Sequence, residues 1–311
     1  MKIIDLKTGK AVRSLPGKTV LALGNFDGVH AGHAELLKKT AEEAKELGAI
    51  PAVWTFGVHP LAYLSKDGFR FLTTNEEKNS VFAEKGMSYA VYEDFRRVRD
   101  LSPETFVKEL LIQKLGCECA VCGFNFSFGK GGLGTPEKLL EIMKSEGKRA
   151  VIVPPVYRCG RIVSSTAVRF FVEEGLMEEA AELIGRPFSI DFPVVEGKKL
   201  GRRIGIPTIN QSFPKDHIKP KTGIYAASCE IGGDVFLCVA NVGSRPTVNP
   251  DENDVNCETH IINYCGWLYG KRIKVSFYKR LRDEKKFDSV EELKKAVELD
   301  IENAKRYFND K

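Results

Sequence analysis

The sequence contains no long apolar run. No stretch approaches the roughly 20 residues that a membrane-spanning helix needs, and the N-terminal segment MKIIDLKTGKAVRS lacks the apolar stretch and cleavage site of a secretory signal. These absences predict a cytoplasmic protein with no membrane partner. No block of Lys and Arg interleaved with aromatic residues is present either, and the net charge of +5 is mild. Nucleic acid is therefore not an expected partner, whereas anionic small molecules are.

The eight cysteines are expected to be reduced in a cytosolic protein. Cys117, Cys119 and Cys122 are close enough to suggest a metal site, but no fourth ligand with zinc spacing lies nearby. The surrounding ECAVCGF is typical of a buried strand, in which Cys is a common core residue. We therefore predict a core strand here rather than a zinc site.

The order of predicted elements favours an α/β class over the first half of the chain. Residues 19–24 (TVLALG) are typical of a buried strand, residues 33–48 of an amphipathic helix that stops at Gly48, and residues 49–56 of a second strand. The alternation continues with strands at 88–93, 117–123 and 149–155 and with helices after Thr74, Ser102, Thr135 and Ser164. Repeated β–α alternation predicts a doubly wound, mostly parallel sheet.

The pattern changes near Arg186-Pro187. Short apolar runs follow at 192–197, 223–231, 234–243, 256–262 and 271–279, and Gly232-Gly233 between two of them is a hairpin signal. We predict a small antiparallel β-barrel, followed by a helix that Ser289 and Glu292 cap and that carries one apolar stripe. The 311 residues thus divide into a domain over 1–185 and a second over 186–311.

The segment Gly24–His33, GNFDGVHAGH, joins the first buried strand to the first helix. Backbone N–H groups at a helix N-terminus bind anions, and the helix dipole favours negative charge there. His30 and His33 are placed to donate hydrogen bonds to phosphate oxygens, and Asp27 to orient a histidine or the turn. The alternative is a tight turn with two helix-capping histidines. The glycines that would admit a phosphate are Gly24, Gly28 and Gly32.

This segment resembles the H-x-G-H signature of the nucleotidyltransferase superfamily. More narrowly, it is similar to the adenylyltransferase module of the bacterial bifunctional riboflavin kinase/FAD synthetase family. Three later segments resemble the same family: TFGVHP at 55–60, GFNFSFGKGGLG at 123–134 and VSSTAVR at 163–169. The resemblance implies a Rossmann-like nucleotidyltransferase domain with His30 and His33 as catalytic residues. It also implies an ATP- and phosphate-binding set of Gly24, Asn25, Phe26, Asp27, Gly32, Asn125, Ser164, Ser165, Thr166 and Arg169.

The residues of these segments also suit phosphate by themselves. The hydroxyls of Ser164, Ser165 and Thr166 lie at an expected helix start, and Arg169 one turn later could grip the same phosphate as a fork. An ordinary helix cap with a surface arginine is the alternative. His59 is equally consistent with lining an ATP pocket and with a loop position before Pro60.

A second candidate site begins at residues 197–210, GKKLGRRIGIPTIN. Glycines between basic residues allow a loop to wrap phosphates. Thr208 and Asn210 share one face of a strand and offer the oxygen ligands that Mg²⁺ on ATP prefers. A basic hairpin loop before a strand is the alternative. The segment resembles the riboflavin kinase motif G-x-x-x-G-R-x-x-G-F-P-T-A-N, with Ile206 for the usual Phe and Ile209 for the usual Ala.

Later segments at 223–227, 241–247, 258–261, 268–273 and 277–289 follow the same family order, so that the resemblance spans about residues 19–308. It implies that Glu258 is the general base for the attacking hydroxyl; a surface cross-strand Glu is the alternative. Asp191-Phe192 departs from the family, which often has a Gly there. The implied ATP- and flavin-binding residues are Gly197, Gly201, Arg202, Gly205, Pro207, Asn241, Arg282 and Phe287.

The family resemblance implies two reactions. The barrel would transfer the γ-phosphoryl group of MgATP to riboflavin, and the α/β domain would adenylylate FMN to FAD with release of pyrophosphate. The alternatives are a nucleotidyltransferase for another phosphorylated small molecule, an enzyme with one activity, and a flavin- or RNA-binding regulator. A class I aminoacyl-tRNA synthetase is disfavoured because no lysine-serine signature loop is found. We expect a monomer or a weak homo-oligomer.

Overall fold

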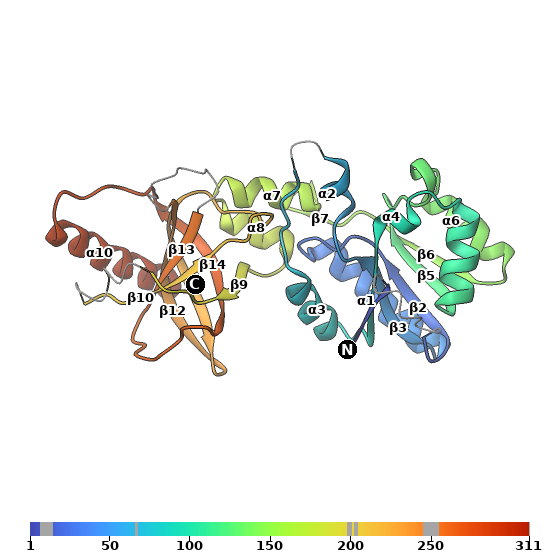
Figure 1. Ribbon diagram of the computed structural model, residues 1–311, viewed down its shortest axis with the longest axis horizontal. Helices are drawn as coiled ribbons and strands as arrows, with labels where there is room; N and C mark the ends of the chain where they lie inside the picture. Colours follow the sequence, from blue (N-terminus) through green and yellow to red (C-terminus); the bar gives the residue numbers. More distant parts are fainter. Residues whose placement is uncertain (7–14, 66–67, 198–200, 202–204, 245–254, 311) are drawn as a thin grey trace. The chain divides into compact units, whose positions relative to one another are not determined.

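The computed structural model describes residues 1–6, 15–65, 68–197, 201, 205–244 and 255–310. Contacts group the chain into two compact units, residues 1–165 and residues 166–311, and each is described by itself (Figure 1). The second unit therefore includes two helices that precede residue 186. The division into functional domains at 185/186 stays a prediction.

The first unit contains a six-stranded sheet in the order β1-β4-β3-β2-β5-β6, and every neighbouring pair is parallel. The doubly wound parallel sheet predicted from the sequence is thus confirmed. Strand β2 is buried along its whole length, as its uninterrupted apolar sequence predicts. The strands are β1 (Lys2–Asp5), β2 (Thr19–Leu23), β3 (Ile50–Phe56), β4 (Tyr89–Glu93), β5 (Cys117–Gly123) and β6 (Arg149–Val153).

Helices cover both faces of this sheet. On one face, α1 (Ala31–Leu47) and α3 (Asn75–Glu84) pack their apolar side chains on alternate residues of β2, β3 and β5. On the other face, η2 (Phe106–Lys114) and α6 (Pro136–Ser145) pack on the remaining residues of the same strands. Shorter helices are α2 (Pro60–Leu64), α4 (Phe95–Val98), α5 (Pro103–Thr105) and η3 (Lys130–Gly132).

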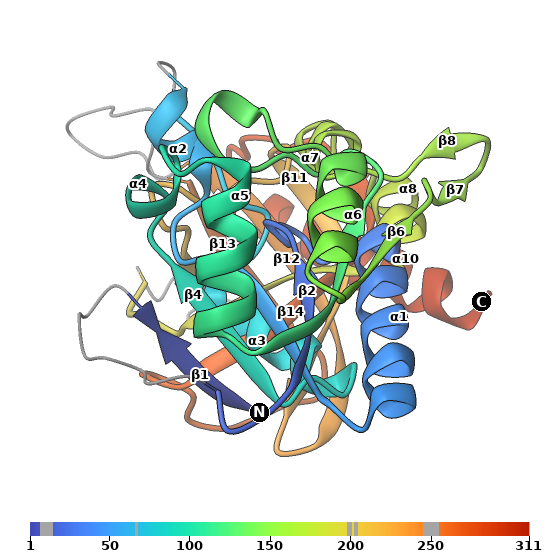
Figure 2. The same ribbon diagram turned by 90° about the vertical axis from the view of Figure 1, so that its right-hand side faces the viewer.

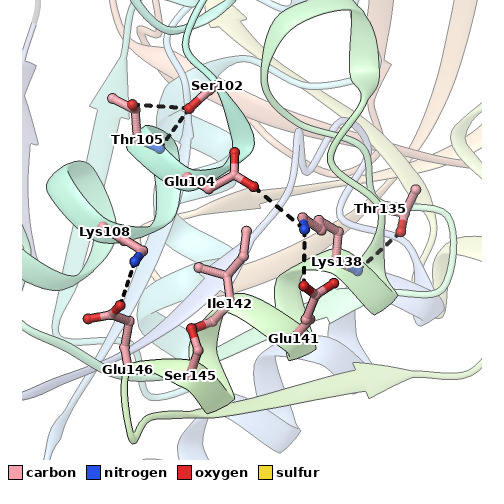
Figure 3. Close-up of polar contacts among 10 residues, drawn as sticks. All are labelled: Ser102, Glu104, Thr105, Lys108, Thr135, Lys138, Glu141, Ile142, Ser145 and Glu146. Atoms are coloured by element: carbon pink, nitrogen blue, oxygen red, sulfur yellow. Dashed lines mark hydrogen bonds and ion pairs between the residues drawn. The ribbon is translucent and has the colours of Figure 1, made fainter.

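The helix expected from Ser102 to Gly116 is present, but its main part has π winding. Ser102 caps its first turn by accepting the Thr105 N–H (3.1 Å), and the Leu115 N–H bonds the Leu110 carbonyl five residues back. Figure 3 shows how charged side chains join this helix to α6. Lys108 pairs with Glu146 at 2.7 Å. Surface pairs of this kind stabilise little, so burial of apolar faces holds this layer together.

Two features of the first unit have no clear sequence signal. Strand β1 pairs with β4 at the sheet edge although its residues are mostly exposed. A two-stranded hairpin of β7 (Tyr157–Arg158) and β8 (Arg161–Ile162) projects from the unit (Figure 2). Cys159 has a positive φ in its turn, before Gly160.

The second unit contains an antiparallel six-stranded sheet in the order β10-β13-β12-β11-β14-β9 (Figure 1). The sheet curls until its two edges meet. Val195, just after edge strand β9, forms a bridge with Asn210 of β10 at the other edge. In addition, Gln211 Nε2 of β10 donates to the Phe192 and Ile273 carbonyls at 2.7 Å. The predicted small barrel is thus confirmed. Its strands are β9 (Phe188–Pro193), β10 (Thr208–Ser212), β11 (Gly223–Ile231), β12 (Asp234–Ser244), β13 (Val255–Ile261) and β14 (Arg272–Arg282).

The hairpin signal at Gly232-Gly233 is confirmed, because Ile231 of β11 pairs with Asp234 of β12. The strand expected at 192–197 is wrong in position: β9 covers 188–193, where Phe188, Ile190 and Phe192 alternate inward. The apolar alternation thus begins directly after Pro187, earlier than we expected.

The described part of the second unit also contains the helices α7 (Ser165–Glu173), whose first residue belongs to the first unit, α8 (Met177–Ile184) and α10 (Val290–Asn309). Ser289 caps α10 by accepting the Glu292 N–H at 3.1 Å, which is one of the two bonds of the predicted capping box. Ile301 and Phe308 of α10 pack against Ile224 and Val239 of the barrel. This contact confirms the predicted apolar stripe, although Val290 at its start is exposed.

Candidate active sites

The loop after β2 lies at the point where the strand order reverses. Strand β2 has β3 on one side and β5 on the other, and Leu23 at its end is in register with Trp54 and Cys122. In open α/β sheets, ligands bind beyond the carboxyl ends of the strands at such a switch point. The topology therefore places residues 24–30 and the turn at 123–125 side by side, where a nucleotide site is expected.

The backbone of the loop is wound tightly. Phe26, Gly28 and Val29 have φ values of 53°, 80° and 36°, a region that a β-branched residue such as Val rarely adopts. A Cβ on Gly28 would lie 2.9 Å from Leu72 Cδ1, so only glycine fits there without displacing Leu72. Backbone strain of this kind persists only where the surrounding structure holds the residues in place, and it is typical of ligand-binding loops.

The two predicted catalytic histidines are brought together at the start of α1. Their rings stack with centroids 3.8 Å apart and planes 13° apart. His30 is the N-cap of the helix, and its Nδ1 accepts the His33 N–H at 3.3 Å. In the neutral ring, the proton of His30 is therefore on Nε2, which makes Nε2–H the donor.

His33 is held in its neutral form. Burial is the largest cause that keeps its pKa well below the ordinary value, and the nearby His30 and Lys78 act in the same direction, as does His59 to a smaller extent. Its buried Nδ1 has no hydrogen-bond partner within the part of the chain that the structure describes. Protonation of both stacked imidazoles would place two positive charges in contact and is energetically unfavourable. The pair is therefore expected to supply hydrogen bonds rather than two charges.

Asp27 fastens the loop to the segment before α3. Its Oδ1 accepts the Leu72 N–H at 2.9 Å, and its carbonyl accepts the Ser165 hydroxyl at 2.8 Å. One residue on, the Gly28 N–H donates to Thr73 Oγ1 at 3.0 Å. Asp27 and Leu72 are both buried. These bonds tie Asp27 to the turn, and its role in the chemistry of the site stays a prediction.

We expect Asp27→Ala to lower the free energy of unfolding of the first unit by about 2 kcal/mol, because it leaves a buried N–H without its acceptor. Trp54, buried in this unit, reports the transition by fluorescence during urea denaturation of the full chain in a Trp267→Phe background. Asp27→Asn keeps an acceptor oxygen and should lose much less. A loss below about 0.5 kcal/mol in the alanine variant, as for ordinary surface substitutions, would contradict this role.

The other residues predicted for this site differ in their burial and in their distance along the chain from the histidine pair. Gly24 and Asn25 connect β2 to the loop, and the Asn25 carbonyl accepts Thr55 Oγ1 at 3.2 Å. Phe26 is buried, and its ring centroid lies 5.1 Å from that of His33. Gly32 lies in the first turn of α1, and Asn125 is exposed in the turn after β5. These positions leave their roles toward ATP as predictions.

The segment before α7 adjoins the loop, through the bond of Ser165 to Asp27. Ser164 directly precedes α7, whose first residue is Ser165. Thr166 and Arg169 lie further along that helix and belong to the second unit. Their predicted contact with phosphate is not tested by the structure.

The structure gives two other groups structural roles. His59 is the N-cap of α2, accepts the Leu61 N–H at 3.1 Å through Nδ1, and stacks on Phe69 with centroids 4.2 Å apart. Whether it also contacts ATP stays open. The three clustered cysteines are buried on β5, and Cys119 packs in a different core from Cys117 and Cys122. The predicted core strand is confirmed.

In the barrel, three predicted residues form one row across three strands. Asn210 of β10 is in register with Glu258 of β13, and Glu258 is in register with Asn241 of β12. Asn256, two residues before Glu258, donates from Nδ2 to Asn210 Oδ1 (3.3 Å) and to Glu258 Oε1 (3.4 Å). Thr208 lies two residues before Asn210 on the same face. The row thus gathers a carboxylate and several neutral oxygens.

The glycine-rich segment packs directly on this row. A side chain at Gly197 would collide with the Asn210 amide. The Gly201 carbonyl accepts the Ile206 N–H at 2.8 Å, and Gly205 is exposed with a φ of 79°. The Pro207 carbonyl lies 2.8 Å from Nδ1 of His260. Arg202 lies outside the described residues.

Arg282 and Phe287 are linked to α10 rather than to this row. Arg282 forms a two-point ion pair with buried Asp300, at 2.8 and 2.6 Å. The Phe287 ring lies 6.0 Å from the guanidinium of Arg282 and 5.4 Å from Nζ of Lys285. Their predicted contact with flavin stays a prediction, and the ion pair joins β14 to α10.

Sequence reasoning missed three residues next to these sites. Lys78 of α3 is buried beside the histidine loop, although a lysine after two glutamates is typical of a solvated helix face. Asn256 and His260 lie on the face of β13 that carries Glu258, and the two-residue period of a strand could have identified both. Burial of Lys78 follows from packing that a local pattern does not contain.

The fold defines a class: a doubly wound parallel α/β unit with a histidine pair at its switch point, followed by a small antiparallel barrel with a glycine-rich segment beside a polar row. Family models agree, since the model described as FAD synthetase matches residues 12–167 and the model described as riboflavin kinase matches residues 184–308. The bifunctional riboflavin kinase/FMN adenylyltransferase of Bacillus subtilis is 34% identical over 306 residues, covering 96% of this chain and 95% of that protein. The Escherichia coli protein of the same name is 34% identical over 292 residues, 93% of this chain and 92% of the relative.

The chain therefore belongs to the bifunctional riboflavin kinase/FMN adenylyltransferase family. A crystal structure named macrolide-efflux protein, from Streptococcus pneumoniae, has the same fold, with a TM-score of 0.86 and 28% identity over 98% of this chain and 99% of that one. Within the described ranges of the present chain, no helix combines the length and apolar character needed to traverse a bilayer.

Proposed function

We propose that the stacked histidine pair marks the FMN adenylyltransferase site, and that the row Asn210–Glu258–Asn241 marks the riboflavin kinase site. The observation that carries the first is the position of the pair at a helix N-terminus at the switch point of a parallel sheet. The alignment of Glu258 between two asparagines supports the second. Family membership supplies the substrates riboflavin, FMN and ATP.

In the kinase step, Glu258 accepts the proton of the riboflavin 5′-hydroxyl as its oxygen attacks the γ-phosphorus of ATP. The new P–O bond forms while the bond to the bridging oxygen breaks, and ADP leaves. Asn256 positions the carboxylate through its amide. Gly197 permits the loop to approach the row without a side chain in the way.

The residues of the row also fit magnesium. Thr208 and Asn210 present neutral oxygens on one face of β10, and a magnesium ion on ATP takes most of its ligands from phosphate and water. No cluster of three His, Cys, Asp or Glu side chains suited to a metal exists among the described residues, so a cage made by the protein alone is absent from them. Magnesium would neutralise the ATP phosphates during transfer.

In the adenylyl transfer step, an oxygen of the FMN phosphate attacks the α-phosphorus of a second ATP, and pyrophosphate leaves with the electron pair of the broken bond. The phosphate is already a competent nucleophile, so no general base is needed. Catalysis consists of alignment and stabilisation of charge. His30 and His33 donate to oxygens of the reacting phosphates, and the N–H groups at the start of α1 add to this field.

Incubation of the full chain with riboflavin and MgATP tests the assignment. Chromatography of the products should show FMN appearing first and FAD accumulating afterwards, and removal of Mg²⁺ with EDTA should stop both steps. FMN without FAD would indicate an enzyme with one activity, and absence of both would overturn the assignment. The cytoplasmic location, the monomeric or weakly self-associating state and the absence of a nucleic-acid partner stay predictions.

A further inference from the structure

A lysine is buried on α3 without a counter-ion bonded to it. Lys78 is the fourth residue of this helix and is only 3% exposed. Among the described residues, none forms a hydrogen bond or ion pair with its ammonium group, and Asp27 acts on it only through its charge. Lysines are seldom buried in this way unless they are paired, because removing the charge from water is costly. Such a position is maintained when a ligand supplies the missing anion.

The buried face of α3 is directed at the histidine loop. Lys78 and Phe82 lie one turn apart on that face, and both are buried. The Phe82 ring packs edge-on against Phe26 with centroids 5.2 Å apart, and Phe26 in turn lies 5.1 Å from His33. The bonds from Leu72 and Thr73 to the loop hold the segment before the helix in place. Lys78 is thus fixed beside the loop rather than reaching it by chance.

The charges around this point are unbalanced. Burial is the main cause that lowers the pKa of Lys78, and Asp27 opposes it. Lys78, His30 and His59 all lower the pKa of His33, which shows that these basic groups act on one small region. One carboxylate oxygen of Asp27 accepts the hydrogen bond from the Leu72 N–H. A bound anion would relieve the repulsion and stabilise the ammonium.

We propose that Lys78 is a further phosphate-binding residue of the adenylyltransferase site, where its ammonium group holds the anionic oxygens of the reacting phosphates. The proposal rests on the proposed function of the histidine loop. In the transfer, FMN phosphate forms a bond to the α-phosphorus and pyrophosphate departs, so negative charge shifts between oxygens without net proton release. A fixed cation beside the histidine pair, of which His33 is held neutral, stabilises that shift.

Lys78→Met removes the charge and keeps the length of the side chain at an apolar site. We expect FAD formation from supplied FMN and MgATP to fall about 10²-fold, the usual loss on removing one fixed group that stabilises transition-state charge. Riboflavin phosphorylation by the same chain should stay within twofold of the wild-type rate. Lys85→Met, at the exposed end of α3, is the matched control and should change neither rate. FAD formation within threefold of wild type in Lys78→Met would overturn the proposal.

If the Lys78→Met variant does not fold, a measurement on the wild-type protein tests whether Lys78 binds phosphate. The pKa of Lys78 is followed by NMR of its Cε with and without inorganic pyrophosphate. Binding of this anion should raise that pKa by at least one unit, and no movement would refute the proposal. If wild-type enzyme makes no FAD, the assignment of the reaction fails, yet the pyrophosphate titration still shows whether Lys78 binds anions.

Discussion

Replacement of Glu258 by glutamine should lower the rate of riboflavin phosphorylation about 10³-fold, within the range that a general base contributes. Glutamine has the same shape and can still contact Asn256, but it cannot accept the proton of the attacking hydroxyl. The half-buried carboxylate lies in register between Asn210 and Asn241, so the substitution removes the one acid-base group of that row. The readout is FMN formed from riboflavin and MgATP under single-turnover conditions.

The two activities of one chain provide the control. Adenylylation of supplied FMN by Glu258→Gln should proceed at the wild-type rate, because the histidine loop belongs to the other unit. Glu230→Gln, at an exposed position of β11 in the same sheet, should leave both rates unchanged. A kinase rate above one tenth of wild type in Glu258→Gln would rule out a base role and leave Glu258 as a cross-strand residue.

The fold could be predicted from the sequence wherever the local pattern of residues determines the structure. Five consecutive buried residues in β2 predict a parallel strand covered on both faces, and the reciprocal bonds of Thr74 and Glu77 at the start of α3 form the capping box that such a sequence favours. The π winding after Thr105 was not accessible. The buried residues of this helix, such as Leu110 and Leu111, follow a pattern that would suit an α-helix equally well.

The candidate sites were only partly accessible. The two histidines are three residues apart in sequence, so their meeting at a helix start follows from the motif. The register that aligns Asn210, Glu258 and Asn241 does not, because residues far apart in the chain are brought together by pairing that one sequence does not specify. Lys78 shows the same limit. Its spacing from Phe82 indicates a shared face, but the packing of α3 determines that this face is buried.

Replacement of His33 by alanine should lower FAD formation from FMN and MgATP about 10³-fold while riboflavin phosphorylation continues. Removal of one fixed hydrogen-bond donor lowers the rate about 10²- to 10³-fold. We expect the larger loss for His33, because its ring also supports His30 by stacking with centroids 3.8 Å apart. His33→Gln restores a donor without an imidazole and should recover part of the rate. FAD formation within tenfold of wild type in His33→Ala would show that the ring only closes the turn.

The pH dependence separates a neutral donor from a cation. Because burial, His30 and Lys78 hold the pKa of His33 below its usual value, the ring stays neutral until the pH falls well below 6.5. Its titration, followed by NMR of the ring carbon, should therefore show no step near 6.5 in the free protein. In Lys78→Met the step should move upward, since a repelling charge has been removed. A protonated His33 at neutral pH would instead make the histidine the cation of the site and leave Lys78 without that role.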